Sequence, residues 1–197
     1  MVDVAKIYGV DAPASGGVDA FATTMASPLW VVPGWASGTP ASYSIGSGNL
    51  FYLPIHVYES TTFDRIGVEV IGAVGGGSLA RLGIYEDSSG RPGDLLLDAG
   101  TVSIAANAEV SIVINQTLSG HYFLCYVGDD TASIRCMDED YIIRSPGQGQ
   151  DDALALSAYL AAYKTGQSGL VAAGLSDPAT QPDTLLYYYL GINLRVA

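Results

Sequence analysis

The sequence predicts an all-β protein, specifically a jelly-roll-like antiparallel β-sandwich with an extended N-terminal arm. In several segments apolar and polar residues alternate, which is the period-2 pattern of half-buried strands. The composition combines 24 glycines and 13 tyrosines with 49% hydrophobic and only 14% charged residues, a balance typical of β proteins with many tight turns. A chain of 197 residues is long enough to bury a sizeable core.

The few charges are strongly biased, and this bias limits the classes of partner. Twenty acidic residues against eight basic ones give a net charge of −12. Phosphate backbones and anionic membrane surfaces are poor partners for such a chain, so nucleic-acid and membrane binding are excluded as functions. The low charge content favours an assembly subunit, because obligate interfaces resemble a core cut in half. No apolar run is long enough for a membrane span, and the N-terminus lacks signal-peptide features, so synthesis in a cytoplasm is expected.

Residues 1–28 are predicted to be an arm that serves attachment or assembly. They contain many small residues and show no sustained period of either kind, so they have too little apolar surface to fold alone. We expect the arm to order by docking on a neighbouring subunit. The side chains expected to make its contacts are Val2, Lys6, Tyr8, Phe21 and Pro28. Residues 29–197 are then the β-sandwich domain.

The domain begins with a short apolar stretch that holds both tryptophans, Trp30 and Trp35. The two rings are interpreted either as a cover over one end of the core or as a platform on which a sugar stacks. Residues 38–48 are rich in Ser, Gly, Thr and Pro and are predicted to be a loop. Residues 49–59 alternate as a strand, in which Pro54 favours an edge strand or a bulge.

The clearest pattern is that of residues 61–87, predicted to form a hairpin that turns at Gly75. This register pairs Ile66 with Ile84, Val68 with Leu82, Val70 with Ala80 and, on the opposite face, Glu69 with Arg81. A second hairpin is predicted from 121–127 and 132–137 through Gly128. It would place Cys125 and Cys136 on facing strands, where two buried thiols are favoured over a disulfide because cytosolic synthesis keeps thiols reduced.

Clustered acidic residues at turns raise the question of a calcium site. Glu86, Asp87 and Asp94 flank one turn, and further acids occur at 129–130 and 138–140. Their spacing does not match the twelve-residue calcium loop, so solvated turns are favoured. His56 and His121 are interpreted as strand residues rather than metal ligands, since nothing with ligand spacing accompanies them.

The remaining segments are predicted from the same patterns. Strands are expected at 100–104 and 109–115. Residues 152–163 fit a strand, with a helix as the alternative because of their alanine content. Residues 164–183 are predicted to be a long surface loop, and 184–196 one long aromatic strand that ends within the sheet.

Several of these segments together resemble a β-domain of virion proteins from tailed bacteriophages and prophages. The resemblance spans roughly residues 29–197 and is carried by residues 49–59, by 61–68 (TTFDRIGV), by 80–85 (ARLGIY), by 90–95 (GRPGDL), by 98–102 (DAGTV), by 116–118 with Tyr122 and by 193–197 (NLRVA). It implies a phage structural protein at the virion surface, of the tail-fibre, spike or head-decoration type. Only about 28 residues precede this part, which favours a short spike, a decoration protein or a small tail protein.

Three functions from different classes follow from these observations. The favoured one is a non-enzymatic virion subunit that decorates the capsid or tail, contacts other virion proteins through its arm, and forms a homo-oligomer with a trimer as the expected form. The alternative is a tail-fibre or spike receptor-binding module in which Trp30, Trp35 or exposed tyrosines stack on host carbohydrate. A glycan depolymerase with paired carboxylates is the least favoured. No catalytic, metal-ligand or phosphate-loop pattern is present, so neither an enzyme nor a cofactor is expected.

Overall fold

The computed structural model confirms the all-β class. It describes residues 30–31, 35–36, 40–137, 142–143, 161–186 and 189–197. The expected arm, residues 1–28, with Val2, Lys6, Tyr8, Phe21 and Pro28, lies outside the described residues. The elements are β1 (Trp30–Val31), β2 (Trp35–Ala36), β3 (Pro40–Ile45), β4 (Leu50–Gly72), β5 (Leu79–Asp87), β6 (Pro92–Ser103), β7 (Ala108–Gly128), β8 (Ala132–Met137), β9 (Ile142–Ile143), β10 (Ala161–Lys164), α3 (Gly169–Ala173), β11 (Thr184–Leu186), β12 (Tyr189–Leu190) and β13 (Asn193–Val196).

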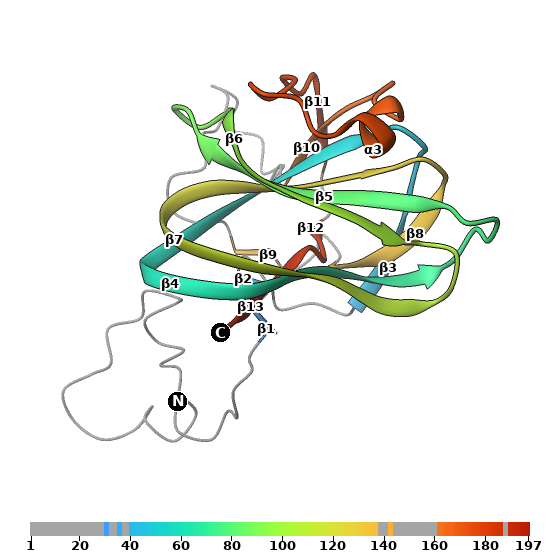
Figure 1. The fold of residues 1–197 in the computed structure, drawn as a ribbon, viewed down its shortest axis with the longest axis horizontal. Coiled ribbons are helices and arrows are strands. Elements are labelled where there is room, and N and C mark those ends of the chain that lie inside the picture. Colours follow the sequence, from blue (N-terminus) through green and yellow to red (C-terminus); the bar gives the residue numbers. More distant parts are fainter. Residues whose placement is uncertain (1–29, 32–34, 37–39, 138–141, 144–160, 187–188) are drawn as a thin grey trace.

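The two longest strands, β4 with 23 residues and β7 with 21, organise the fold. They pair antiparallel from Phe51 opposite Tyr126 to Val70 opposite Ala108, with a break in register between Val57 and Thr61. Figure 1 shows both strands turning back at the left edge of the view. Irregularities of this kind bend a strand and increase its twist, so one pair of strands runs through two differently directed halves of the sheet.

Each half of the β4–β7 pair gathers its own neighbours. Beside the first half of β4 and the second half of β7 lie β10 on one side and β5 followed by β6 on the other. Beside the second half of β4 lie β13 and then β1, while β8 joins β4 at Val70 and carries β3 and β12. With β11, which pairs with β10, these strands form one continuous sheet of eleven strands, and β2 pairs with β9 separately. The division into two sheets that a sandwich requires therefore stays a prediction.

Both halves of the sheet turn one face toward the same apolar core. It contains Leu53 and Ile55 from the first half of β4, Ile66 and Val68 from its second half, and side chains of β5, β7, β8 and β13. A smaller second core lies on the opposite face of the first half, where Tyr52, Tyr85 and Cys125 pack under residues that follow β10. No described helix is long and apolar enough to cross a membrane.

The two predicted hairpins are wrong in pairing, although the buried face predicted for the first is correct. Ile66, Val68, Val70, Ala80, Leu82 and Ile84 all lie in the main core. However, β5 pairs with β6 and β7 rather than with β4, so Glu69 forms its ion pair with Arg135, and Arg81 with Asp98. Likewise β8 pairs with β3, β4 and β12 instead of β7. A two-residue period fixes which face is buried but leaves the neighbouring strand open.

Other segments also depart from the expectation. Pro40–Ile45, predicted as loop, is strand β3 along β8, because pairing overrides weak local propensity. Residues 165–183 contain helix α3 and cover part of the sheet, and the expected single strand at 184–196 is divided into β11, β12 and β13. Of the strand predicted at 152–163, its end is confirmed within β10 and the rest lies outside the described residues. The C-terminal strand does end within the sheet, as predicted.

Two smaller predictions are confirmed. Cys125 and Cys136 are buried thiols that form no disulfide. Pro54 lies where one side of β4 is locally an edge, because the pairing of β4 with β10 covers only Leu50 to Tyr52 and its pairing with β13 covers only Phe63 to Gly67. Proline is tolerated there because it has no N–H to donate to a ladder.

Candidate functional site

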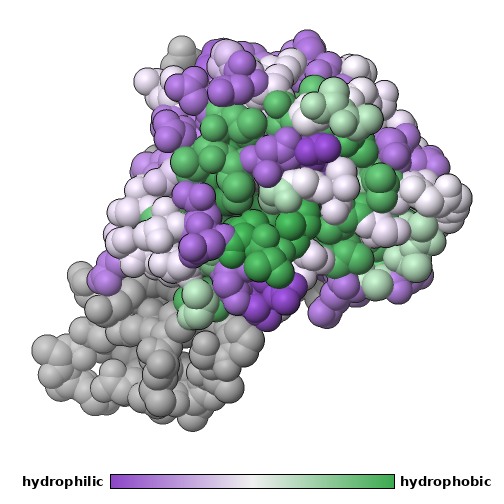
Figure 2. Space-filling view, in the orientation of Figure 1, coloured by the Kyte–Doolittle hydropathy of each residue, from purple (hydrophilic) through white to green (hydrophobic). Residues whose placement is uncertain are grey.

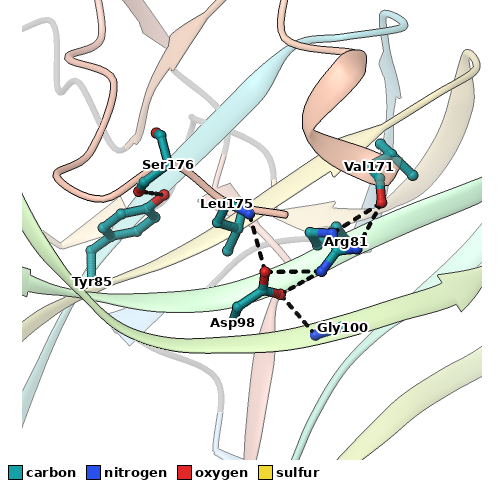
Figure 3. A network of polar contacts seen from close by, with 7 residues as sticks. All are labelled: Arg81, Tyr85, Asp98, Gly100, Val171, Leu175 and Ser176. Carbon is teal, nitrogen blue, oxygen red and sulfur yellow. Dashed lines mark hydrogen bonds and ion pairs between the residues drawn. The ribbon is translucent and has the colours of Figure 1, made fainter. Parts of the chain in front are cut away.

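Residues 165–183, here called the strap, cover the second core. Val171, Leu175 and Ala179 of the strap are buried against side chains of β4, β5 and β7. Figure 3 shows α3 and the chain after it lying across β5 and β6. The close fit requires a glycine beneath the strap, since a Cβ on Gly83 would lie 2.3 Å from Leu175 Cδ1 and 2.6 Å from the Leu97 carbonyl oxygen. The strap is therefore part of the packed structure.

An ion pair between β5 and β6 fixes the strap to the sheet (Figure 3). Arg81 Nη1 donates to both carboxylate oxygens of Asp98, at 2.8 and 2.9 Å. The same guanidinium donates from Nε and Nη2 to the Val171 carbonyl oxygen, and Asp98 accepts hydrogen bonds from the N–H groups of Leu175 and Gly100. The side chains are only 16% and 26% exposed. Apart from their bonds to each other, the hydrogen bonds of Arg81 and Asp98 are made to backbone groups of the strap and of Gly100.

The electrostatics of Asp98 agree with this structural role. Burial alone would raise the pKa of Asp98, but the hydrogen bonds from Arg81, Leu175 and Gly100, with the Arg81 charge, outweigh burial and hold the pKa below its usual value. The carboxylate is therefore ionised at neutral pH. A general acid would need the opposite shift, so this group is suited to binding the strap rather than to proton transfer.

Two buried tyrosines anchor the next part of the strap. Tyr85 donates its hydroxyl hydrogen to the Ser176 carbonyl oxygen at 2.9 Å, and Tyr52 donates to that of Thr180 at 2.8 Å. Burial, with smaller contributions from neighbouring groups, raises the pKa of both phenols, so each remains a neutral donor. Burial likewise raises the pKa of the Cys125 thiol, which makes it a poor nucleophile.

A second arrangement lies on the outer face of the other half of the sheet. Trp30 of β1 is opposite Arg195 of β13, Arg195 is opposite Arg65 of β4, and Arg65 is opposite Val113 of β7. Their neighbours Leu194 and Ile66 point into the core, which places these four side chains on the other face. We call this set of four residues the Trp30 row. Its two ends are exposed, Trp30 by 38% and Val113 by 69%.

Polar contacts hold the two arginines of the Trp30 row in place. Arg195 Nε donates to Asp64 Oδ1 at 2.7 Å, and Arg65 Nη1 donates to Ser111 Oγ at 3.2 Å. The hydrogen bond from Arg195, with the charges of both arginines, outweighs desolvation and lowers the pKa of Asp64. The row thus presents an indole ring, two oriented guanidinium groups and an exposed aliphatic side chain across four strands.

The two tryptophans belong to different sheets. Trp30 belongs to the main sheet, whereas the backbone of Trp35 pairs with Ile143 in the separate β2–β9 sheet. Sequence reasoning identified Trp30 but missed Arg65, Val113 and Arg195. Only knowledge of the strand order β1-β13-β4-β7 brings these residues to Trp30.

The preference for solvated turns over a calcium site stays a prediction, and several of the described acidic side chains accept hydrogen bonds. Asp87 accepts from the Gly90 N–H in the turn between β5 and β6, Asp129 accepts from the Leu79 N–H, and Asp130 from the Ser78 hydroxyl. Residues 138–140 lie outside the described part. Within the described ranges no group of three His, Cys, Asp or Glu side chains is placed to hold a metal ion.

Comparisons with known proteins add no relative to these observations. No protein-family model, no curated protein and no solved structure matches the chain.

Proposed function

We propose that this chain is a non-enzymatic structural protein of a bacteriophage virion, a surface subunit that decorates the capsid or tail. In this proposal the Trp30 row and the N-terminal arm, residues 1–28, contact other virion proteins, and the subunit acts as a homo-oligomer. The sequence resemblance to phage virion β-domains supports the class of protein. The Trp30 row is the structural observation that carries the docking role.

The residue types of the Trp30 row favour a protein partner. Tryptophan and arginine are the side chains most enriched among residues that dominate binding energy at protein interfaces. Trp30 and Val113 offer apolar area, while the contacts of Arg195 and Arg65 pre-orient their guanidinium groups. As an observation independent of the Trp30 row, Figure 2 shows hydrophobic side chains gathered near the middle of the viewed face, bordered by hydrophilic ones. Surface of this kind marks interaction sites.

The buried polar residues support a structural rather than an enzymatic role. The hydrogen bonds of these residues join the sheet to the strap backbone, to the Gly100 N–H or to one another, and they involve Arg81, Asp98, Tyr52 and Tyr85. A catalytic group needs capacity left for substrate. The network instead stabilises a rigid surface for assembly.

The test adds purified protein to particles assembled without it and measures occupancy. Trp30→Ala and Arg65→Ala should each weaken the affinity for the particle, measured from occupancy over a range of protein concentrations, by at least about tenfold, since a hot-spot residue contributes about 2 kcal/mol or more. The matched control is Tyr58→Ala, which removes an exposed ring of similar accessibility, 43%, outside the row. Wild-type occupancy of both row variants would refute docking through the Trp30 row, and failure of the wild-type protein to bind particles would refute the virion role.

A tail-fibre or spike module that recognises host carbohydrate is the second candidate. It is favoured by the exposed Trp30 ring beside the Arg195–Asp64 pair, because sugars stack on aromatic faces and their hydroxyl groups form hydrogen bonds with charged side chains. Binding to host surface glycans, lost in Trp30→Ala while particle occupancy stays unchanged, would support this candidate over docking.

A further inference from the structure

The only two histidines of the chain meet in the sheet. His56 of β4 lies directly opposite His121 of β7, far away in the sequence. Their rings are stacked, with centroids 4.0 Å apart and planes inclined by 5°. Adjacent imidazoles repel each other when both are protonated, so the pair lies together as neutral rings, the form of histidine that binds metal ions.

The backbone holds this pair at a fixed separation. His56 and His121 form the second-last pair before the register breaks, and the ladder continues without interruption from there to Phe51 opposite Tyr126. Gly120, with φ of 107°, allows the turn of β7 immediately beside His121. Bulges and register breaks of this type often adjoin binding sites because they aim side chains.

The separation suits two ligands of one metal ion. Zinc and similar ions bind imidazole nitrogen at about 2.0–2.1 Å, so two nitrogens on one tetrahedral ion lie about 3.3–3.4 Å apart. The rings are stacked in nearly parallel planes with centroids 4.0 Å apart, so both side chains rotate out of the stack before one nitrogen of each points at the same ion. His121 is exposed and His56 partly exposed, so an ion from solvent reaches both. The Tyr58 ring also contacts that of His56, with centroids 4.1 Å apart and planes inclined by 49°.

We propose that His56 and His121 form a two-histidine site for a divalent late first-row transition metal, which links β4 to β7 at the bend of the sheet. Imidazole ligands suit Zn²⁺, Ni²⁺ and Cu²⁺, and Cu²⁺ binds most tightly of the divalent series. Water fills the remaining coordination positions, because no third His, Cys, Asp or Glu is placed as a ligand among the described residues. The site is independent of the Trp30 row.

A metal at this site stabilises the folded chain. The two rings are adjacent only when β4 and β7 are paired, so the ion binds the folded state in preference to the unfolded one. The expected readout is a rise in melting temperature with metal concentration, reversed by a chelator.

The test titrates the full-length, metal-free protein with CuCl₂ and, separately, with ZnCl₂. We expect one ion per chain by calorimetry, and selective broadening of both histidine ring signals by Cu²⁺ in NMR spectra. His56→Asn and His121→Asn should each weaken binding by at least about tenfold, since loss of even an outer partner of a metal ligand costs 10–100-fold. Tyr58→Phe, which keeps both imidazoles, should bind as the wild type.

A variant that fails to fold would also lose metal binding, so folding of each variant is checked separately. Each should keep the wild-type circular dichroism spectrum without metal, and His121→Gln provides a second substitution at the more exposed position. Equal metal affinity of the wild type and the double His56→Asn, His121→Asn variant would overturn the proposal. So would the absence of saturable binding at millimolar metal.

Discussion

Replacing Asp98 by asparagine should release the strap from the sheet. The carboxylate accepts hydrogen bonds from Arg81, Leu175 and Gly100, and an amide of the same shape can serve only part of this set. Breaking one side of a fully buried ion pair costs about 3–5 kcal/mol. The residual exposure of 16% and 26% reduces this figure, and we expect a loss of about 2–4 kcal/mol in unfolding free energy.

Urea denaturation of the wild type and Asp98→Asn measures this loss. For a chain of this size it corresponds to a fall in melting temperature of about 4–16 °C. Glu69→Gln is the matched control, because the Glu69–Arg135 pair has similar geometry but lies at the surface, with side chains 35% and 39% exposed. It should cost less than half as much. Limited proteolysis should cut Asp98→Asn first within residues 165–183. Equal effects of the two variants, with no new cleavage there, would refute the role assigned to Asp98.

Three further predictions concern the same part of the fold. Gly83→Ala should lower the free energy of unfolding in urea by about 1–3 kcal/mol, because its Cβ would overlap Leu175 and the Leu97 carbonyl. Gly169→Ala is the control and should not lower it, because its Cβ meets no atom within 4 Å. Equal stability of both variants would contradict the fit of the strap. Folding lowers the pKa of Asp98, so this carboxylate contributes stability above about pH 4 that is lost as the pH falls through the pKa of the folded state. Acid titration should therefore destabilise the wild type more steeply than Asp98→Asn. Parallel curves of stability against pH for the two proteins would count against this linkage. A thiol reagent should label neither Cys125 nor Cys136 in the folded protein and both in denaturant; labelling of the folded protein would contradict their burial.

The predictable part of this fold is the part fixed by alternation. Ile66, Val68 and Val70 are buried as their spacing predicts, and so are Ala80 and Leu82 across the Gly75 turn. Which strands pair was not predictable from local pattern, because β7, which begins at Ala108 beyond the whole of β6, enters between β4 and β5. Local turn signals favour neighbouring strands, and long-range pairing overrode them.

The candidate sites depend on that long-range pairing. Trp30 stood out in the sequence as one of two tryptophans, but Arg195 and Arg65 join it only through the β1-β13-β4 order. The strap was expected to be a surface loop because of its glycine, serine and proline content, and its anchors Arg81 and Asp98 show no local signal. A site formed by side chains on neighbouring strands can be located only when the pairing register of those strands is known.

The most direct test of the proposed function is the location and orientation of this chain on the intact particle by cryo-electron microscopy. The proposal predicts density at regular capsid or tail positions, with the face bearing Trp30 and Arg65 turned toward the particle and adsorption unchanged in particles that lack the protein. Density at the distal end of the tail, with that face turned outward and adsorption lost without the protein, would contradict it in favour of receptor binding.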